Sequence, residues 1–332
     1  MVRTFILQWH LSENCNLKCL HCYQEDHIPM CISYKKLEHI YYEFINLIDK
    51  LGMRGHINIT GGEPLCNPHL FKILDLIKKD DKVSFSILTN GTLIDLDTAL
   101  KIKSYNPDYV QVSLEGGKKI NDYIRGKGTY NQIKKGIKNL KKAGIFTSIS
   151  FTGNHINYKE FPKVVRFGKR LKVDNIWSDR YIPLGGSMDK ELTMSKEETR
   201  EYLDIMKKER LKMNKKSKTR ISMNRALQFT RTNDYAYSCT CGDTLLTVME
   251  NGDLVPCRRM PIVVGNVLID NMYDLYKNNN ILKDLRKKTI PEDCKKCEHS
   301  NRCRGGLKCL TYAVTGNYNL KDVGCDLWKI IF

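Results

Sequence analysis

The chain has 332 residues, of which 41% are hydrophobic and 28% charged, and its formal net charge at pH 7 is +18. This length exceeds one average domain and predicts a large domain followed by a smaller one. No apolar stretch approaches the roughly 20 residues that cross a bilayer, and the N-terminus lacks the features of a signal peptide. Composition therefore argues against a membrane or secreted protein and predicts a cytoplasmic one.

The excess of basic residues has two interpretations. Lysine pairs such as Lys134-Lys135 and Lys207-Lys208 are typical of solvated helix faces, which is the simpler explanation. The alternative is attraction to an acidic partner, such as an acidic peptide or a nucleic acid. A nucleic-acid partner is disfavoured because no helix-turn-helix, RNP-type aromatic sheet or zinc-finger pattern is present.

From residue 5 to about residue 182, short β-rich segments alternate with segments of helical periodicity. Strands are predicted at Phe5–His10, His56–Thr60, Val83–Leu88, Tyr109–Leu114, Phe146–Phe151 and Asn175–Ile182. Helices are predicted at Tyr34–Leu51, Pro68–Lys79, Asp95–Ser104, Asn131–Ala143 and Tyr158–Leu171. This alternation indicates a parallel α/β sheet, and six strands suit a partial (β/α)6 barrel with reactive groups at the C-terminal ends of the strands.

The predicted barrel covers residues 1–194, and a helical bridge follows at 195–237. A charged helix is expected over residues 195–216, because Ser195 and Glu198 form a capping-box pattern at its start. Residues 238–332 are rich in cysteine and short turns, such as Asn251-Gly252, which predicts a small α+β domain that depends on metal.

The thirteen cysteines fall into one group of three, one group of eight, and the separate Cys31 and Cys66, which we interpret as structural or incidental. Clustered cysteines in a reducing compartment favour metal sites over disulfides. The first group, Cys15, Cys19 and Cys22, has the spacing Cys-x3-Cys-x2-Cys. Three thiolates suit an iron–sulfur cluster that normally takes four, so one iron would stay open to bind a reactant. A zinc knot or three unrelated thiols are the alternatives.

The cysteine segment resembles the signature of the radical S-adenosylmethionine (SAM) superfamily, with Tyr23 at the position where that family carries an aromatic residue. After the second predicted strand, Thr60-Gly61-Gly62-Glu63-Pro64 resembles the family motif that holds the methionine amino group of SAM. The two glycines let the backbone approach a ligand closely, and the Glu63 carboxylate and the backbone carbonyls can accept hydrogen bonds from an ammonium group.

Further segments resemble the family in order along the chain. Thr89-Asn90-Gly91-Thr92 closes the third strand, and Ser113-Leu114-Glu115-Gly116 closes the fourth. The resemblance implies that Ser113 contacts the ribose, that Arg125 contacts the methionine carboxylate, and that Arg180 faces the cofactor region. It also implies the chemistry: one electron from the cluster breaks a C–S bond of SAM, and the resulting 5′-deoxyadenosyl radical removes a hydrogen atom from the substrate.

The eight later cysteines make two four-ligand sites, which sequence alone allows to be zinc or iron–sulfur sites. Their layout resembles the SPASM auxiliary-cluster domain, although the spacing Cys303-x5-Cys309 and the closeness of Cys239 to Cys241 depart from its usual pattern. The resemblance implies an auxiliary cluster I held by Cys239, Cys241, Cys257 and Cys309. It implies an auxiliary cluster II held by Cys294, Cys297, Cys303 and Cys325, and thus three [4Fe–4S] clusters with SAM as cofactors.

SPASM-bearing radical SAM enzymes mostly modify peptides or proteins, so the resemblance implies such a substrate and a reductant such as ferredoxin or flavodoxin. We expect a crosslink, thioether or side-chain oxidation, with epimerisation as an alternative. Sulfatase maturation is disfavoured because Arg258 and Arg259 follow Cys257, where that branch has an Asp. Only about a dozen residues precede Cys15, so we expect leader recognition by a separate protein or by the barrel. A non-catalytic electron-transfer protein is the alternative of a different class, disfavoured by the intact SAM motifs.

Overall fold

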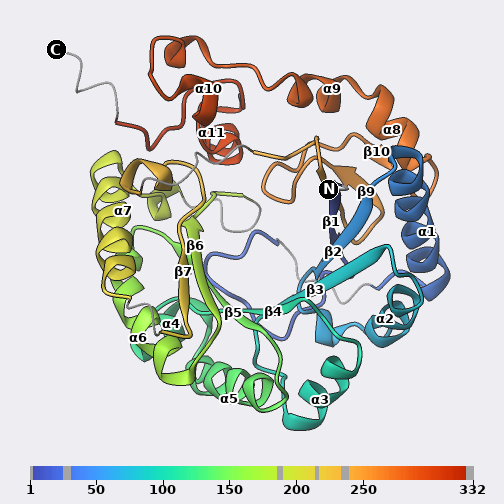
Figure 1. The fold of residues 1–332 in the computed structure, drawn as a ribbon, viewed down its shortest axis with the longest axis horizontal. Coiled ribbons are helices and arrows are strands. Elements are labelled where there is room, and N and C mark those ends of the chain that lie inside the picture. Colours follow the sequence, from blue (N-terminus) through green and yellow to red (C-terminus); the bar gives the residue numbers. More distant parts are fainter. Residues whose placement is uncertain (1–2, 25–30, 185–189, 214–216, 233–238, 327–332) are drawn as a thin grey trace.

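The computed structural model describes residues 3–24, 31–184, 190–213, 217–232 and 239–326. Their strands form one sheet in the order β10-β9-β8-β1-β2-β3-β4-β5-β6-β7, curved into an open barrel (Figure 1). The pairs from β1 to β7 are parallel, as is β1–β8, whereas β8–β9 and β9–β10 are antiparallel. The strands are β1 Thr4–His10, β2 Arg54–Thr60, β3 Val83–Thr89, β4 Tyr109–Ser113, β5 Thr147–Gly153, β6 Asn175–Arg180, β7 Arg220–Ser222, β8 Leu245–Val248, β9 Asp253–Val255 and β10 Gly265–Asn266.

Helices cover the outside of the barrel (Figure 1). They are α1 Tyr34–Leu51, α2 Leu70–Lys78, α3 Leu96–Ser104, α4 Lys118–Arg125, α5 Thr129–Lys142, α6 Phe161–Leu171, α7 Lys196–Leu211, α8 Met272–Asn278, α9 Asn280–Lys287, α10 Ser300–Cys303 and α11 Lys308–Thr315. The predicted α/β fold, with its six alternating strands and five helices, is confirmed with shifts of a few residues at the ends. Helix α4 was not predicted.

The barrel is held together by a large apolar core between the sheet and its helices. Strand β1 alternates between buried and partly buried residues over most of its length, and its Phe5, Leu7 and Trp9, which share one face, are fully buried. Helix α1 presents apolar residues at helical spacing, and its Phe44 meets Phe5 edge to face at a centroid distance of 6.4 Å. Each such side chain stabilises the fold by about 1.5–3 kcal/mol on burial, so this core is a large source of stability that does not involve metal.

The C-terminal part of the chain continues the barrel sheet. Strand β8 pairs with β1, and the paired residues run from Ile6 opposite Leu245 to Trp9 opposite Val248. Helix α8 then packs beside α1, where Glu43 accepts a hydrogen bond of 2.7 Å from the backbone N–H of Met272. The segments coloured orange to red pass from β10 to the neighbourhood of β6 and α7, across the open side of the barrel (Figure 1). The predicted division at residue 238 therefore does not separate two independent sheets.

The predicted bridge contains α7, whose capping box is present: Ser195 accepts a hydrogen bond from the Glu198 N–H, and Glu198 accepts one from Ser195. The helix ends at Leu211 rather than at residue 216, and residues 214–216 and 233–237 of the bridge lie outside the described residues. In the described part of the chain, no helix has the length and apolarity to cross a membrane.

The last part of the chain has a much smaller core. Its members surround the later cysteines and are Ile182, Ala226, Cys241, Met260, Leu285, Leu307, Cys309 and Leu310. Two of these buried residues are themselves predicted metal ligands, and the nearby helices α10 and α11 have only 4 and 8 residues. Apolar burial alone gives this region little stability.

Candidate active site

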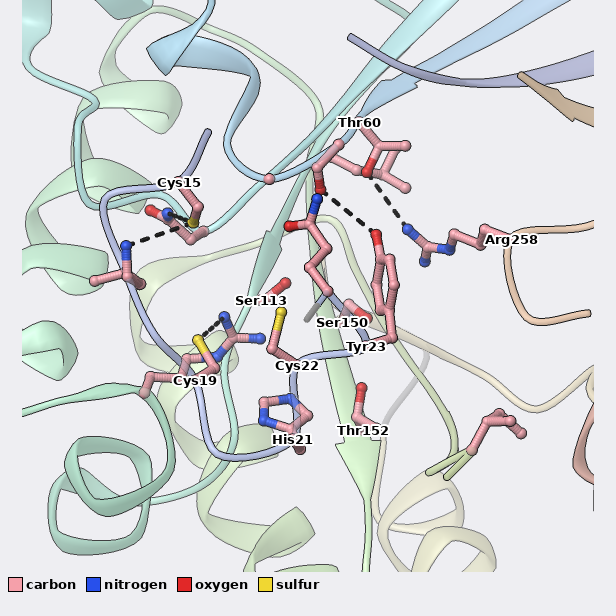
Figure 2. Close-up of a pocket in the computed structure, with 18 of the residues that line it drawn as sticks. Cys15, Cys19, His21, Cys22, Tyr23, Thr60, Ser113, Ser150, Thr152 and Arg258 are labelled. Carbon is pink, nitrogen blue, oxygen red and sulfur yellow. Dashed lines mark hydrogen bonds between the residues drawn. The ribbon is translucent and has the colours of Figure 1, made fainter. Parts of the chain in front are cut away.

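A cavity of about 1080 Å³ opens at the carboxyl ends of the barrel strands. The loop after β1 supplies Cys15, Cys19 and Cys22 to its wall, as Figure 2 shows. Ser113, at the end of β4, faces the same space, with Ser150 and Thr152 on β5. Because parallel strands all end at this edge, residues from distant parts of the sequence meet here.

The three thiols stand in a setting that suits an iron–sulfur cluster. The Leu17 N–H donates to Cys15 Sγ at 3.4 Å, and the Asn90 amide donates to the same sulfur at 3.9 Å. Arg125 Nη1 donates to Cys19 Sγ at 3.7 Å. Such N–H donors stabilise thiolates. Burial raises the pKa of Cys15 to about 12 and also raises those of Cys19 and Cys22, so metal binding must release their protons.

A buried charge network holds the cysteine loop. Arg125 Nε and Nη2 donate to the same oxygen of Glu115, at 3.2 and 2.6 Å, and His21 Nε2 lies 3.4 Å from that oxygen. Burial alone would raise the pKa of Glu115, but Arg125 and His21 outweigh it and bring the pKa to about 2. Arg125 lines the cavity, yet its guanidinium is bound to Glu115, a partner that sequence reasoning did not supply.

Glu63 has a different place from the one that sequence reasoning expected. Its carboxylate accepts hydrogen bonds from Thr89 Oγ1 at 2.7 Å, the Asn90 N–H at 2.7 Å and the Leu65 N–H at 3.2 Å. The residue is fully buried, and neither Glu63 nor Pro64 lines the cavity. Its carboxylate thus joins the ends of β2 and β3 and is not open to a ligand. Asn90, by contrast, does line the cavity.

Gly61 and Gly62 lie directly against the cysteine loop. A Cβ atom on Gly62 would stand 2.3 Å from the carbonyl oxygen of Asn14 and 2.4 Å from that of Glu13. Hydrogen bonds from the Gly62 N–H to Ser12 and from the Glu63 N–H to Asn14 fix this approach, at 2.7 and 2.9 Å. Only glycine allows the two loops to come so close. Both glycines line the cavity.

The side of the cavity near Tyr23 is formed by residues from three regions. The Tyr23 hydroxyl donates to the Gly61 carbonyl at 3.5 Å, and Arg258 Nη1 donates to Thr60 Oγ1 at 3.4 Å (Figure 2). The ring of the fully buried His10 lies tilted against that of Tyr23 at a centroid distance of 5.8 Å, and neither of its ring nitrogens has a hydrogen-bond partner among the described residues. Burial and, to a smaller extent, Arg258 lower the pKa of His10 to about 3.

Arg180 lines the cavity but is bound in a pair. Its two η nitrogens donate to the two oxygens of Asp322 at 2.8 and 2.6 Å, and both side chains are buried. This pair ties the end of β6 to the C-terminal part of the chain. Nearby, Arg259 Nη1 donates to Asp179 at 2.6 Å. No local sequence signal pointed to Asp322.

The structure brings the later cysteines near one another, with Cys303 lining both the cavity of one predicted set and a space beside Cys239 and Cys241 of the other. Cys294, Cys297, Cys303 and Cys325 line one cavity of about 360 Å³. Of the other four, Cys241 is hydrogen-bonded to Cys239 and Cys257, and Cys309 interacts electrostatically with those two residues. The Cys241 thiol donates to Cys257 and lowers the pKa of Cys257 to about 6.

The thiols surround spaces and do not converge on a point. Within the described ranges, no group of three or more His, Cys, Asp or Glu side chains could hold one metal ion. Four cysteines around one cavity fit a cluster of several irons better than a single zinc, whose ligands all lie within about 2.3 Å of the metal. Neither Cys31 nor Cys66 lines the large cavity or the two smaller cavities beside the later cysteines.

Comparison with known families agrees with this geometry. Residues 9–168 match the Radical SAM superfamily, and residues 239–298 match SPASM, an iron–sulfur cluster-binding domain. The chain belongs to the radical SAM superfamily and carries a SPASM domain. It is therefore an enzyme of that superfamily, and it binds SAM and [4Fe–4S] clusters, with additional clusters in the SPASM domain.

Three relatives illustrate the range of this family. Fe-coproporphyrin III synthase of Methanosarcina barkeri is 32% identical over 64% of this chain, but the match spans only 53% of that relative. AdoMet-dependent heme synthase of the same organism is 24% identical over 96% of this chain and 95% of its own length. Mycofactocin maturase MftC of Mycobacterium tuberculosis is 25% identical over 90% of this chain and 77% of its own length.

A solved structure shares the fold over almost the whole chain. Streptococcus suis SuiB bound to precursor peptide SuiA superposes with a TM-score of 0.77 at 18% identity, and covers 98% of this chain and 76% of SuiB. The fold of the barrel and of the C-terminal part is therefore that of a radical SAM–SPASM protein.

Proposed function

We propose that this enzyme modifies a peptide or protein by removing a hydrogen atom and then a second electron, which gives a crosslink, a thioether or an oxidised side chain. The observation that carries the proposal is the shared cavity. Cys15, Cys19 and Cys22 line it on one side, and Arg258 and Arg259, which follow Cys257, line it on another. A substrate between them would lie between the site of hydrogen abstraction and an electron acceptor.

Different residues of the cavity would hold the cluster and the different parts of SAM. Cys15, Cys19 and Cys22 would hold the cluster with the open iron, and Gly61 and Gly62 would offer backbone carbonyls to the ammonium group. Bound there, the cofactor pair supplies a carbon-centred radical that takes hydrogen from the substrate.

Tyr23, Asn90 and Ser113 also line the cavity and would contact other parts of SAM. Arg125 donates through Nη2 to Glu115 and through Nη1 to Cys19 Sγ. Its contact with the methionine carboxylate therefore stays a prediction. The charged groups of Glu63 and Arg180 are bound to protein partners at the ends of strands, and a contact of either residue with SAM stays a prediction.

The auxiliary clusters would be held by the two cysteine groups described above. Arg259 supports this role for the first group. Burial lowers the pKa of Arg259, but the negative charges of Asp179, Cys309 and Cys257 outweigh burial and raise it. A fixed guanidinium beside two thiolates stabilises their negative charge. This arrangement suits an electron acceptor that is close to the substrate.

A peptide substrate is supported by the relatives named as maturases, MftC among them, and by the SuiB structure with its precursor peptide. Epimerisation stays open, because it uses the same hydrogen abstraction. Sulfatase maturation is disfavoured because Arg258 follows Cys257, where that branch has an Asp.

The test uses reconstituted, reduced enzyme with SAM and the short peptides encoded beside its gene. A loss of about two mass units per event, expected for the removal of two hydrogens, supports crosslinking or oxidation. Unchanged mass with deuterium uptake from solvent would indicate epimerisation. Peptides that stay unmodified while SAM is cleaved would contradict the proposal.

A porphyrin substrate is the second candidate. It is favoured by the similarity to AdoMet-dependent heme synthase. That match covers 95% of the relative, so it extends beyond a single shared domain. Coproporphyrin III in the same assay, followed by mass spectrometry, separates the two candidates.

A further inference from the structure

The large cavity is lined by more arginines than the predicted SAM contacts account for. Among the described residues, its lining includes Arg125, Arg180, Arg258 and Arg259 but no aspartate or glutamate. Three of these arginines already have buried carboxylate partners: Glu115, Asp322 and Asp179. Their charges are therefore compensated within the protein.

Arg258 is the exception. None of the described carboxylates forms a salt bridge within 4.0 Å of its guanidinium. Its hydrogen-bond and ring contacts are Thr60 Oγ1 at 3.4 Å and the Tyr23 ring, whose centroid lies 5.9 Å from the guanidinium carbon, and it also interacts electrostatically with the adjacent Cys257 thiol. A half-buried guanidinium with five N–H donors and only hydroxyl partners retains most of its capacity to bind an anion.

The backbone holds this arginine in place. The Arg258 N–H donates to Thr247 Oγ1 at 3.0 Å, and the Met260 N–H closes a turn onto the Cys257 carbonyl at 2.8 Å. The turn follows β9 and β8, which are joined to the barrel through β1. The side chain therefore enters the cavity from a fixed support and not from a free loop.

Arg258 lies toward the later cysteines. Figure 2 shows Arg258 beyond Tyr23, on the opposite side of the cavity from Cys19. Arg258 directly follows Cys257, and its contacts with Tyr23 and Thr60 place it at the border of the proposed SAM site. A substrate that lies between the two cysteine groups passes this guanidinium.

We propose that Arg258 binds a side-chain carboxylate of the peptide substrate, so that the enzyme selects an aspartate or glutamate close to the residue it modifies. This inference rests on the proposed function, which it narrows to an acidic substrate class. A guanidinium and a carboxylate can form two parallel hydrogen bonds, which give direction as well as charge attraction.

The experiment selects peptides without knowing the natural substrate. An mRNA-displayed library of random peptides is passed over immobilised, anaerobically reconstituted enzyme loaded with SAM. The C-terminus of each peptide is blocked by its link to the mRNA, so only side-chain carboxylates are tested. We expect the wild-type enzyme to enrich aspartate or glutamate at one position, and replacement of that residue by its amide to weaken binding about tenfold.

Three variants assign the effect to one side chain. Arg258→Gln should lose both the enrichment and the difference between acid and amide, and Arg258→Lys should keep part of them, because it retains the charge but not the paired donors. Arg220→Gln removes one positive charge from an exposed strand residue and should behave like the wild type. Iron content and the spectrum of each variant check that its clusters are intact.

The outcomes are distinct. Equal binding of acid and amide by the wild type, or a preference that persists in Arg258→Gln, would overturn the role of Arg258. If no peptide is selected while coproporphyrin III binds in an Arg258-dependent manner, the peptide substrate itself is overturned. Enrichment that disappears in Arg258→Gln and persists in Arg220→Gln supports the proposal.

Discussion

The barrel and the region from Cys294 to Cys325 hold their cysteines by different means. In the barrel, the cysteine loop rests on a large apolar core and on buried polar networks around Glu63 and Glu115. Of the eight members of the small core, only Leu307, Cys309 and Leu310 come from the later region, and its helices are short. We therefore expect the barrel to support an open iron on a preformed loop, and the later region to need its clusters to fold.

Removal of the clusters should affect the two regions unequally. We expect hydrogen exchange in α10 and α11 to lose most of its protection in cluster-free protein, while β3 and β4 keep theirs. Structural metal sites in small domains contribute on the order of 10 kcal/mol, which exceeds what the small core supplies.

A variant with Cys294→Ala and Cys297→Ala should reproduce the C-terminal loss in otherwise loaded protein. Cys15→Ala with Cys19→Ala should leave exchange in the barrel strands unchanged. Equal loss of protection in both regions on cluster removal would show that the barrel also depends on metal.

The close approach of Gly62 to the cysteine loop allows a test of how the barrel holds that loop. Gly62→Ala places a methyl group within 2.4 Å of two backbone carbonyls, which cannot move without shifting the loop. We expect SAM affinity to fall at least about tenfold, measured by the change in the electron paramagnetic resonance spectrum on SAM addition. Gly117→Ala meets only the flexible ends of Lys163 and Glu160 and is the matched control. An affinity unchanged in Gly62→Ala would mean that the loop is not held as described.

The Glu115 network predicts a dependence on pH in cluster-free protein. The pKa of Glu115 is lowered from 4.5 to about 2, so the ionised carboxylate stabilises the fold above pH 4.5, and this stabilisation disappears as the pH falls toward 2. Removing one partner of a buried pair costs about 3–5 kcal/mol, so Glu115→Gln should lower the free energy of unfolding by about that amount at pH 7.

Denaturant titrations of the two proteins measure this difference. It should shrink as the pH falls from 4.5 toward 2. Glu292→Gln, which affects a side chain that is 82% exposed, should change stability by less than about 0.5 kcal/mol at every pH. A difference between wild type and Glu115→Gln that does not vary with pH would contradict the assignment.

Sequence periodicity predicted the strands and helices that repeat around the barrel because each has a long apolar face. Helix α4 was missed, since Lys118–Arg125 is polar and only Asn121, Ile124 and Arg125 are buried in it. Strand β8 was missed because four residues carry little periodic signal, and its pairing with β1 joins residues about 240 positions apart.

The cysteines of the site could be predicted because metal ligands need characteristic spacings, and the structure groups them as expected. The partners of the charged residues could not. Arg125 with Glu115 and Arg180 with Asp322 are pairs set by tertiary packing, the second across 142 positions. The cavity-facing role of Arg258 was likewise invisible until β8 and β9 were placed beside β1.

The most direct test of the account compares SAM cleavage in two sets of cysteine variants. Reduced wild-type enzyme should release 5′-deoxyadenosine and methionine and contain about twelve irons per chain, as expected for three four-iron clusters. The variant with Cys15→Ala, Cys19→Ala and Cys22→Ala should keep about eight irons and release neither product. Cleavage of SAM that persists in this variant would contradict the assignment of the open iron to the barrel loop.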